Sequence, residues 1–86
     1  MKIKDGFLLK EVAGNFVVVP VGDVSFEAML TLNETGLLIW KLLEDGAEKD
    51  TLVKAILSEY DITEELAEKD VEAFLQKLSN AGILEK

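Results

Sequence analysis

The hydrophobic pattern of this chain changes its period at Asn33. Upstream, apolar side chains recur at every second position from Phe26 to Leu32, which is typical of a strand with one buried face. Downstream, apolar residues recur every three or four positions from Leu38 to Leu43, which is typical of an amphipathic helix. Asn33 is a favoured helix N-cap because its side-chain oxygen accepts a first-turn N–H. The pattern therefore predicts a strand that runs directly into a helix.

Two further strands are predicted before this joint. Residues 7–13 alternate imperfectly, and Gly14-Asn15 after them is a two-residue hairpin signal. Phe16 to Val19 is the run with the highest strand propensity. Pro20 has no N–H to donate, so we expect it to end that strand. Residues 26–31 then form the third strand. Because consecutive strands usually pair, we predict an antiparallel meander with the second strand in the middle.

Three helices are predicted after the sheet. The first covers residues 34–45 and is closed by Gly46. The second covers about 48–60 and lacks a clear N-cap. The third follows the N-cap Thr63, has acidic residues in its first turn and runs to about residue 81, before Gly82. The fold class is therefore α+β, with a three-stranded antiparallel sheet followed by three helices.

Gly36 is unexpected inside the first helix, because glycine there costs up to about 1 kcal/mol in helix propensity. Close backbone packing against the sheet is one explanation.

Length and composition limit the class of protein. Residues 1–86 suffice for a single domain with one core. No apolar run approaches the roughly 20 residues needed to cross a bilayer, and the first residues lack the apolar segment of a signal peptide. We therefore expect a cytoplasmic protein that does not engage membranes. The absence of cysteine excludes disulfides, thiolate nucleophiles and cysteine metal sites.

Catalytic chemistry is not indicated by the residue types present. There is no histidine, the usual general acid or base, and Ser25, Ser58 and Ser79 have no obvious base nearby. Residues 61–70 lack the spacing of a calcium loop, and no glycine-rich phosphate loop is found. We expect no enzyme activity, no catalytic residue, no metal and no cofactor.

The net charge of −8, with nine lysines and no arginine, bears on the kind of partner. Nucleic-acid binding draws much of its affinity from neutralising phosphates, so such a chain is poorly equipped for it. A basic or mostly apolar partner fits better, and acidity that serves solubility alone is at least as good an explanation.

The third helix carries more apolar surface than one core contact needs. Leu66 and Ala73 lie about 100° around the helix from its main apolar stripe, beside Asp70 and Lys77. They either pack under a neighbouring loop or form one wall of a groove. The main stripe consists of Ala67, Val71, Phe74, Leu75, Leu78 and Ala81.

The outer strands of a meander expose unpaired backbone groups, which proteins usually protect with charge or proline. The first strand contains Lys10 and Glu11, whereas the third carries only Glu27. One interpretation is that the third helix or a second copy of the chain covers this edge. Alternatively, the edge stays free to pair with an extended peptide by strand addition.

The order of short motifs along the chain resembles the PqqD family. The resemblance covers nearly the whole chain from Phe7 onward, and Pro20 with the longer connection at 21–25 places the chain in a divergent branch outside the pyrroloquinoline quinone pathway itself. The matching segments are Leu32-Asn33-Glu34-Thr35-Gly36, Ile39-Trp40, Leu42-Leu43, Glu59-Tyr60-Asp61-Ile62, Asp70-Val71-Glu72-Ala73-Phe74-Leu75 and Ala81-Gly82-Ile83-Leu84.

The resemblance implies a winged-helix-turn-helix-like domain that recognises the leader segment of a ribosomally made precursor peptide. Such domains present the precursor to a modifying enzyme, often a radical S-adenosylmethionine (radical SAM) protein. Relatives bind the leader as an added strand against the third strand, with the third helix as the opposite wall. The peptide-binding residues implied here are Phe26, Glu27, Ala28, Met29, Leu30, Leu66, Asp70, Ala73 and Lys77. The signature residues Leu32, Asn33, Thr35, Gly36 and Trp40 are assigned to folding.

The leading hypothesis is thus a non-catalytic peptide-binding module whose partners are a leader peptide and a modifying enzyme. Proline in place of Ala28 or Met29 is expected to disrupt the peptide ladder. One alternative is a winged-helix transcription regulator, although its third helix would bring Glu65, Glu68 and Glu72 close to phosphates. Another is a docking subunit that bridges two proteins without contacting a precursor.

Overall fold

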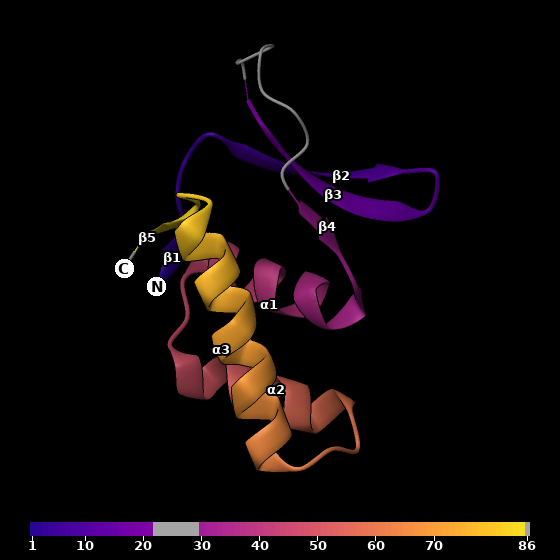
Figure 1. Ribbon diagram of the computed structural model, residues 1–86, viewed down its shortest axis with the longest axis vertical. Coiled ribbons are helices and arrows are strands. Elements are labelled where there is room, and N and C mark those ends of the chain that lie inside the picture. The colour runs from indigo at the N-terminus through magenta and orange to yellow at the C-terminus, as the bar shows by residue number, and fades with distance from the viewer. Residues whose placement is uncertain (22–29, 86) are drawn as a thin grey trace.

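A computed structural model describes residues 1–21 and 30–85 and shows a three-stranded sheet beside a body of three helices (Figure 1). The predicted α+β class, with three antiparallel strands followed by three helices, is confirmed. A further two-stranded sheet joins the two ends of the chain. The strands are β1 (Lys2–Ile3), β2 (Phe7–Val12), β3 (Asn15–Pro20), β4 (Leu30–Leu32) and β5 (Leu84–Glu85). The helices are α1 (Glu34–Asp45), α2 (Lys49–Glu59) and α3 (Glu64–Asn80).

The three-stranded sheet has the predicted order, with β3 between β2 and β4. Val18 in β3 pairs with Leu9 on one side and Leu30 on the other, and its side chain is fully buried. Pro20 is the last residue of β3, as expected for a residue without an N–H. The predicted third strand begins in a part of the chain outside the described residues, and its described part is Leu30–Leu32.

The turn between β2 and β3 lies one residue earlier than the sequence analysis predicted. Val12 pairs with Asn15, so the turn residues are Ala13 and Gly14, and β2 ends before Ala13. Both turn residues have positive φ, 53° and 84°. A type I′ hairpin turn needs positive φ at both central positions, and glycine meets this requirement at the second one. Asn15, predicted as a turn residue, is instead the first residue of β3.

Helix α1 has the predicted bounds because both of its ends carry strong local signals. The side-chain Oδ1 of Asn33 accepts a hydrogen bond from the Gly36 N–H at 2.7 Å. At the other end Gly46 adopts φ 92°, and its N–H donates to the Leu43 carbonyl. The strand-to-helix joint at Asn33 is therefore confirmed.

Helices α2 and α3 differ in how well their first turns are capped. The Thr63 Oγ1 accepts from the Leu66 N–H at 3.2 Å, so α3 begins where predicted and ends one residue early, at Asn80. Glu48 makes no side-chain capping bond, and α2 is one residue shorter than predicted at each end.

Lys49 Nζ donates to Glu72 Oε2 at 2.9 Å, which links α2 to α3 and raises the pKa of Lys49. No helix of the described residues is both long enough and apolar enough to span a bilayer.

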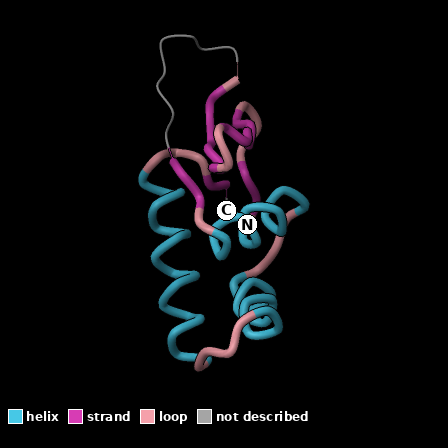
Figure 2. The backbone as a smooth tube through the Cα atoms, turned by 90° about the vertical axis from the view of Figure 1, so that its right-hand side faces the viewer, coloured by secondary structure: helices cyan, strands magenta, loops and turns pink. Residues whose placement is uncertain are grey.

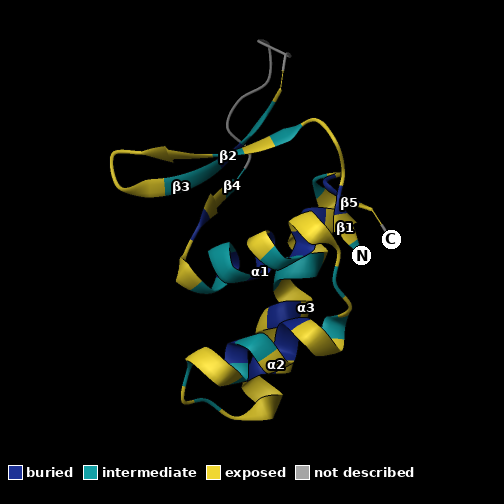
Figure 3. Cartoon of the chain, turned by 180° about the vertical axis from the view of Figure 1, so that it is seen from behind, coloured by how far each residue is buried: buried dark blue, intermediate teal, exposed yellow. Residues whose placement is uncertain are grey.

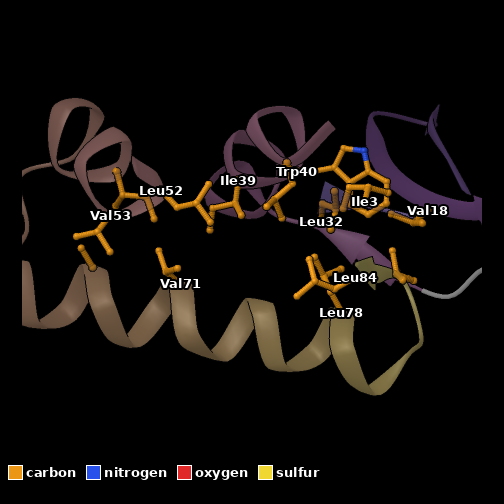
Figure 4. Packing of buried hydrophobic residues seen from close by; sticks show 14 residues of the cluster. Ile3, Val18, Leu32, Ile39, Trp40, Leu52, Val53, Val71, Leu78 and Leu84 are labelled. Carbon is orange, nitrogen blue, oxygen red and sulfur yellow. The ribbon is translucent and has the colours of Figure 1, made fainter. Parts of the chain in front are cut away.

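The core lies where β4 and the terminal strands meet the three helices (Figure 4). Trp40 is 1% exposed, and its Nε1 donates to Glu44 Oε2 at 3.3 Å, which supports its prediction as a core residue. Along α3 the predicted main stripe faces inward, with Ala67, Val71 and Leu78 fully buried. The rest of the core consists of Ile3, Val18, Leu32, Ile39, Leu43, Leu52, Val53, Ile56, Ile83 and Leu84.

The pairing of the two chain ends was not predicted from the sequence. Strand β1 pairs antiparallel with β5, with Ile3 opposite Leu84, and the Lys4 N–H donates to the Ile83 carbonyl at 2.8 Å. Figure 2 shows the two ends side by side between the sheet and the helices. Each strand has two residues, too few for a recognisable alternation, so only the folded chain brings them together.

Candidate peptide-binding groove

The predicted groove wall on α3 is a row of four exposed residues. Leu66, Asp70, Ala73 and Lys77 are spaced by four, three and four positions, so they lie on one side of the helix. Leu66 is 50% exposed, although it is a large apolar side chain. The fully buried stripe of α3 lies on another side of the helix. The described residues therefore leave this row uncovered.

A pocket of about 230 Å³ opens between α3 and the start of α1. From α3 it is lined by Asp70, Ala73 and Lys77, so three of the four α3 residues proposed from the sequence come together at one site. Leu66 does not line it and lies one helical turn before Asp70. The remaining lining residues are Asn33, Thr35, Gly36, Ile39 and Phe74.

At Gly36, helix α1 lies close to both β4 and α3. A Cβ atom on Gly36 would lie 3.1 Å from Phe74 Cε1 and 3.6 Å from Leu32 Cδ2. Close packing against the sheet was one explanation for this glycine, and the position of Leu32 supports it. The structure shows that Gly36 also packs against α3, through the Phe74 ring. Glycine at this position thus brings the end of β4 close to the pocket.

Four of the five residues assigned to folding have that role, all except Thr35, and several of the five also line the pocket. Leu32 and Trp40 are buried, and Asn33 caps α1. Yet Asn33, Gly36 and the half-buried Thr35 belong to the pocket wall. This second role was missed because it depends on α3, which is some forty residues away along the chain.

Ile39 and Phe74 are lining residues that the sequence analysis placed only in the core. A signal for Phe74 was present. It follows Ala73 directly, so it lies about 100° around the helix, at the border between the buried stripe and the exposed row. Ile39 is 1% exposed and forms the floor of the pocket from α1.

Strand β4 forms the second part of the site. It pairs with β3 along one side, and no strand of the described residues pairs along its other side. Leu30 is half-buried and Leu32 buried, whereas Thr31 between them is exposed on the opposite face. Of the strand residues proposed for peptide contact, Leu30 lies at this edge. Phe26, Glu27, Ala28 and Met29 lie outside the described residues.

The charges of the groove are of opposite sign at its two ends. Asp70 and Lys77 are seven residues apart on α3, which corresponds to about 10 Å along the helix axis. An extended peptide along α3 would meet a negative charge and then a positive one, which favours one direction of binding.

Within residues 1–21 and 30–85, histidine, cysteine and acidic side chains form no cluster of three that is suited to hold a metal ion. The arrangement thus offers unpaired backbone, an apolar pocket floor and a charged rim.

Three antiparallel strands followed by three helices, with a pocket between the first and third helices, define a winged-helix-like module in which no described strand pairs with the outer side of β4. Its sequence matches the family described as Coenzyme PQQ synthesis protein D (PqqD) over residues 15–84. The chain belongs to this family, which confirms the resemblance found in the sequence. The family match begins at β3, so it leaves out β1 and β2.

Two solved structures share the fold over almost their whole length. One is described as TbiB1 in complex with the TbiA(beta) leader peptide; it is 30% identical, has a TM-score of 0.81, and the match covers 99% of this chain and 95% of that one. The other is lasso peptide synthetase B1 complexed with the leader peptide, 24% identical, with a TM-score of 0.80 and 99% and 96% covered. The second supports the fold alone. None of the curated proteins matches this chain.

Proposed function

We propose that this chain is a non-catalytic module that binds the leader of a ribosomally made precursor peptide and presents the precursor to a modifying enzyme. The observation that carries the proposal is the likeness to TbiB1, whose structure was solved with a leader peptide. The outer edge of β4, with which no described strand pairs, supports it independently. The proposed peptide-contact residues remain Phe26, Glu27, Ala28, Met29 and Leu30 of the third strand predicted from the sequence. On α3 they are Leu66, Asp70, Ala73 and Lys77.

Strand addition explains how such a small site obtains affinity and selectivity. Main-chain hydrogen bonds to the edge of β4 bind an extended segment, while pockets select alternate side chains. The pocket at α3 is smaller than the roughly 300–1,000 Å³ of sites that enclose a small molecule, which favours one inserted side chain over a whole small-molecule ligand. Asp70 and Lys77 then select the direction of the peptide.

The lack of catalytic chemistry is part of the proposal. The chain has no histidine or cysteine, and its described ionisable side chains are all at least partly exposed. The chemistry would therefore reside in a separate enzyme, for which a radical SAM protein is our proposal from the family resemblance. A cytoplasmic location fits a module that meets its precursor soon after synthesis.

Filling the pocket tests the role of the groove. Ala73→Phe places a large side chain into the pocket lining at an exposed helix position, where the fold tolerates it. We expect this variant to weaken binding of the leader at least tenfold. The probe is a fluorescein-labelled synthetic leader of a precursor peptide identified from the neighbouring genes, and the measurement is fluorescence anisotropy. Ser79→Phe is the matched control, because Ser79 is exposed on the same helix about 120° away. Equal affinity in both variants contradicts the groove, and no binding to the wild-type chain contradicts the proposed function.

A backbone scan of the leader tests strand addition itself. In an antiparallel ladder the peptide N–H groups point alternately toward and away from the partner strand. Methylation of single backbone nitrogens of the leader should therefore weaken binding at every second position of the bound segment. Loss of affinity without this alternation would indicate another binding mode. The proline variants at Ala28 and Met29 test the same ladder from the protein side.

A further inference from the structure

The outward face of the three-stranded sheet is more apolar than a solvent-exposed face requires. Strand pairing places Leu8 opposite Val19 and Lys10 opposite Val17, and Val12 lies on the same face. This is the face opposite the fully buried Val18, because successive side chains of a strand alternate. The Val21 N–H donates to the Gly6 carbonyl, so the ladder continues and adds Val21 to this face. We call Leu8, Lys10, Val12, Val17, Val19 and Val21 the outer sheet face. The polar Asn15 and Thr31 border this set on the same side of the sheet, opposite Val12 and Val17.

This face is exposed within the described residues. Leu8 is 47%, Val12 55% and Val21 53% exposed, and Val17 and Val19 are half-buried. In Figure 1 the labelled helices all lie on one side of the sheet, and Figure 3 shows exposed and intermediate residues along the β2–β3 hairpin. An antiparallel sheet with one solvated face normally carries polar residues there. Contiguous exposed apolar side chains instead indicate an interaction surface.

A second copy of the chain is a poor occupant of this face. Strands β2 and β3 each span about 20 Å and the three described residues of β4 about 10 Å, which at about 4.8 Å per strand gives an area of roughly 250 Å². A stable interface needs about 800 Å² from each partner, so two copies facing each other here fall short. The net charge of −8 on each copy also opposes self-association, and a symmetric pairing would bring Lys10 close to its own counterpart.

The chemistry of the face favours a different protein as partner. Among the described residues on this side of the sheet, Lys10 is the only charged one, and Leu8 and Val12 lie on either side of it along β2. A complementary surface is apolar and supplies one carboxylate to Lys10. The limited area is suited to a transient contact, as expected between an enzyme and the carrier of its substrate.

The position of the outer sheet face indicates which protein docks there, and this step rests on the proposed function. A leader that adds to the edge of β4 extends the same sheet by one strand. Alternate side chains of the bound leader then lie on the continuation of the outer sheet face. A protein seated there contacts the carrier and the bound leader together. We propose that the outer sheet face is the docking surface for the enzyme that modifies the precursor, and that leader binding strengthens this docking.

Acidic residues on the outer sheet face test the proposal. The double variant Leu8→Glu/Val12→Glu places carboxylates where the partner is apolar. The matched control Thr51→Glu/Ser58→Glu adds the same charge at exposed positions of α2. Each variant is produced in cells together with the precursor and its modifying enzyme, and the modified peptide is quantified by mass spectrometry. We expect at least a tenfold loss of product for the double variant and near wild-type yield for the control.

Leader affinity measured on the same purified variants separates this proposal from the proposed function. The double variant should bind the leader within twofold of the wild-type affinity, because its changes are on β2, away from the edge of β4. Normal product yield from the double variant overturns the docking proposal. A wild-type dimer that the double variant dissociates, seen by sedimentation, assigns the face to a second copy instead. Failure of the wild-type chain to bind the leader overturns the proposed function.

A crosslinking variant keeps the proposal testable should the double variant not fold. Val12 replaced by p-benzoylphenylalanine adds a photoreactive apolar side chain at an exposed strand position. We expect a crosslink to the purified modifying enzyme, at least threefold stronger when the leader is present. The same side chain at Thr51 is the control. The absence of a crosslink at Val12 contradicts the docking. A crosslink whose strength does not change with the leader contradicts the coupling between docking and leader binding.

Discussion

Gly36 shows how one small residue sets the geometry of the groove. Its missing side chain leaves room for the Phe74 ring of α3 and lets Leu32 at the end of β4 lie close by. The same residue donates its N–H to the capping oxygen of Asn33. Glycine lowers the helix propensity of α1 by about 1 kcal/mol relative to alanine, so the close packing offsets a local cost.

Substitutions at Gly36 should separate helix propensity from packing. Gly36→Ala gains about 1 kcal/mol of helix propensity, but its Cβ lies 3.1 Å from Phe74, so we expect the free energy of unfolding to change by less than about 1 kcal/mol. Gly36→Val adds two further carbons and should destabilise the protein by about 1–3 kcal/mol through overpacking. Urea unfolding followed by circular dichroism measures both. A valine variant as stable as wild type would show that Phe74 moves aside at no cost.

Among the elements, the small β1–β5 sheet closes the fold by joining the two ends of the chain. Ile3 and Leu84 are each 8% exposed and pack into the common core. The Met1 carbonyl accepts from the Ala47 N–H at 2.9 Å, so the first residues also bridge to the segment between α1 and α2. Two-residue strands have little stability of their own, so the sheet depends on this packing.

Truncation of Ile3 should therefore be costly. Ile3→Ala removes a buried side chain and is expected to lower the free energy of unfolding by about 2–4 kcal/mol. Lys2→Ala, on the exposed side of the same strand, is the control and should change it by less than about 0.5 kcal/mol. Both values come from urea unfolding curves. Similar curves for the two variants would mean that β1 contributes little to the folded state.

On the scale of the whole molecule, the distribution of charge weighs against the alternative of a DNA-binding regulator. The net charge is −8, and the exposed side of α3 carries Glu65, Glu68 and Glu72 beside Lys69. Lys69 is 3.7 Å from the Glu65 carboxylate, so part of its charge is already compensated. Such a helix would meet phosphates with net repulsion.

We accordingly expect no measurable binding of duplex DNA at about 150 mM salt, where specific DNA-binding proteins have dissociation constants of about 10⁻⁸–10⁻¹¹ M. The measurement is a titration of a mixed-sequence fluorescent duplex, followed by anisotropy. A leader-binding assay in the same buffer shows that the protein is active. Binding that weakens steeply as salt is raised would revive the regulator hypothesis.

The helices and the order of strands in the three-stranded sheet were predictable from sequence because their signals are local. Asn33 and Gly46 mark the two ends of α1 through hydrogen bonds within a few residues, and Thr63 does the same at the start of α3. The apolar stripe of α3 follows directly from helical spacing. Where the local signal was weak the prediction was less accurate, as at the uncapped start of α2 and in the hairpin turn, which lies at Ala13-Gly14.

The amino-acid sequence by itself determined the three helices, the strands of the larger sheet, the caps of α1 and α3, the buried stripe of α3 and the family, since all of these depend on residues close together along the chain or on their order. Only the tertiary structure decided that β1 pairs with β5, that Phe74 packs on Gly36, and that Thr35 and Ile39 line one pocket with Ala73. These contacts join residues about 35 to 80 positions apart, and their geometry follows from how the helices pack on the sheet. The spacing of hydrophobic residues indicates which side of a helix or strand is buried. It does not indicate which other element that side packs against.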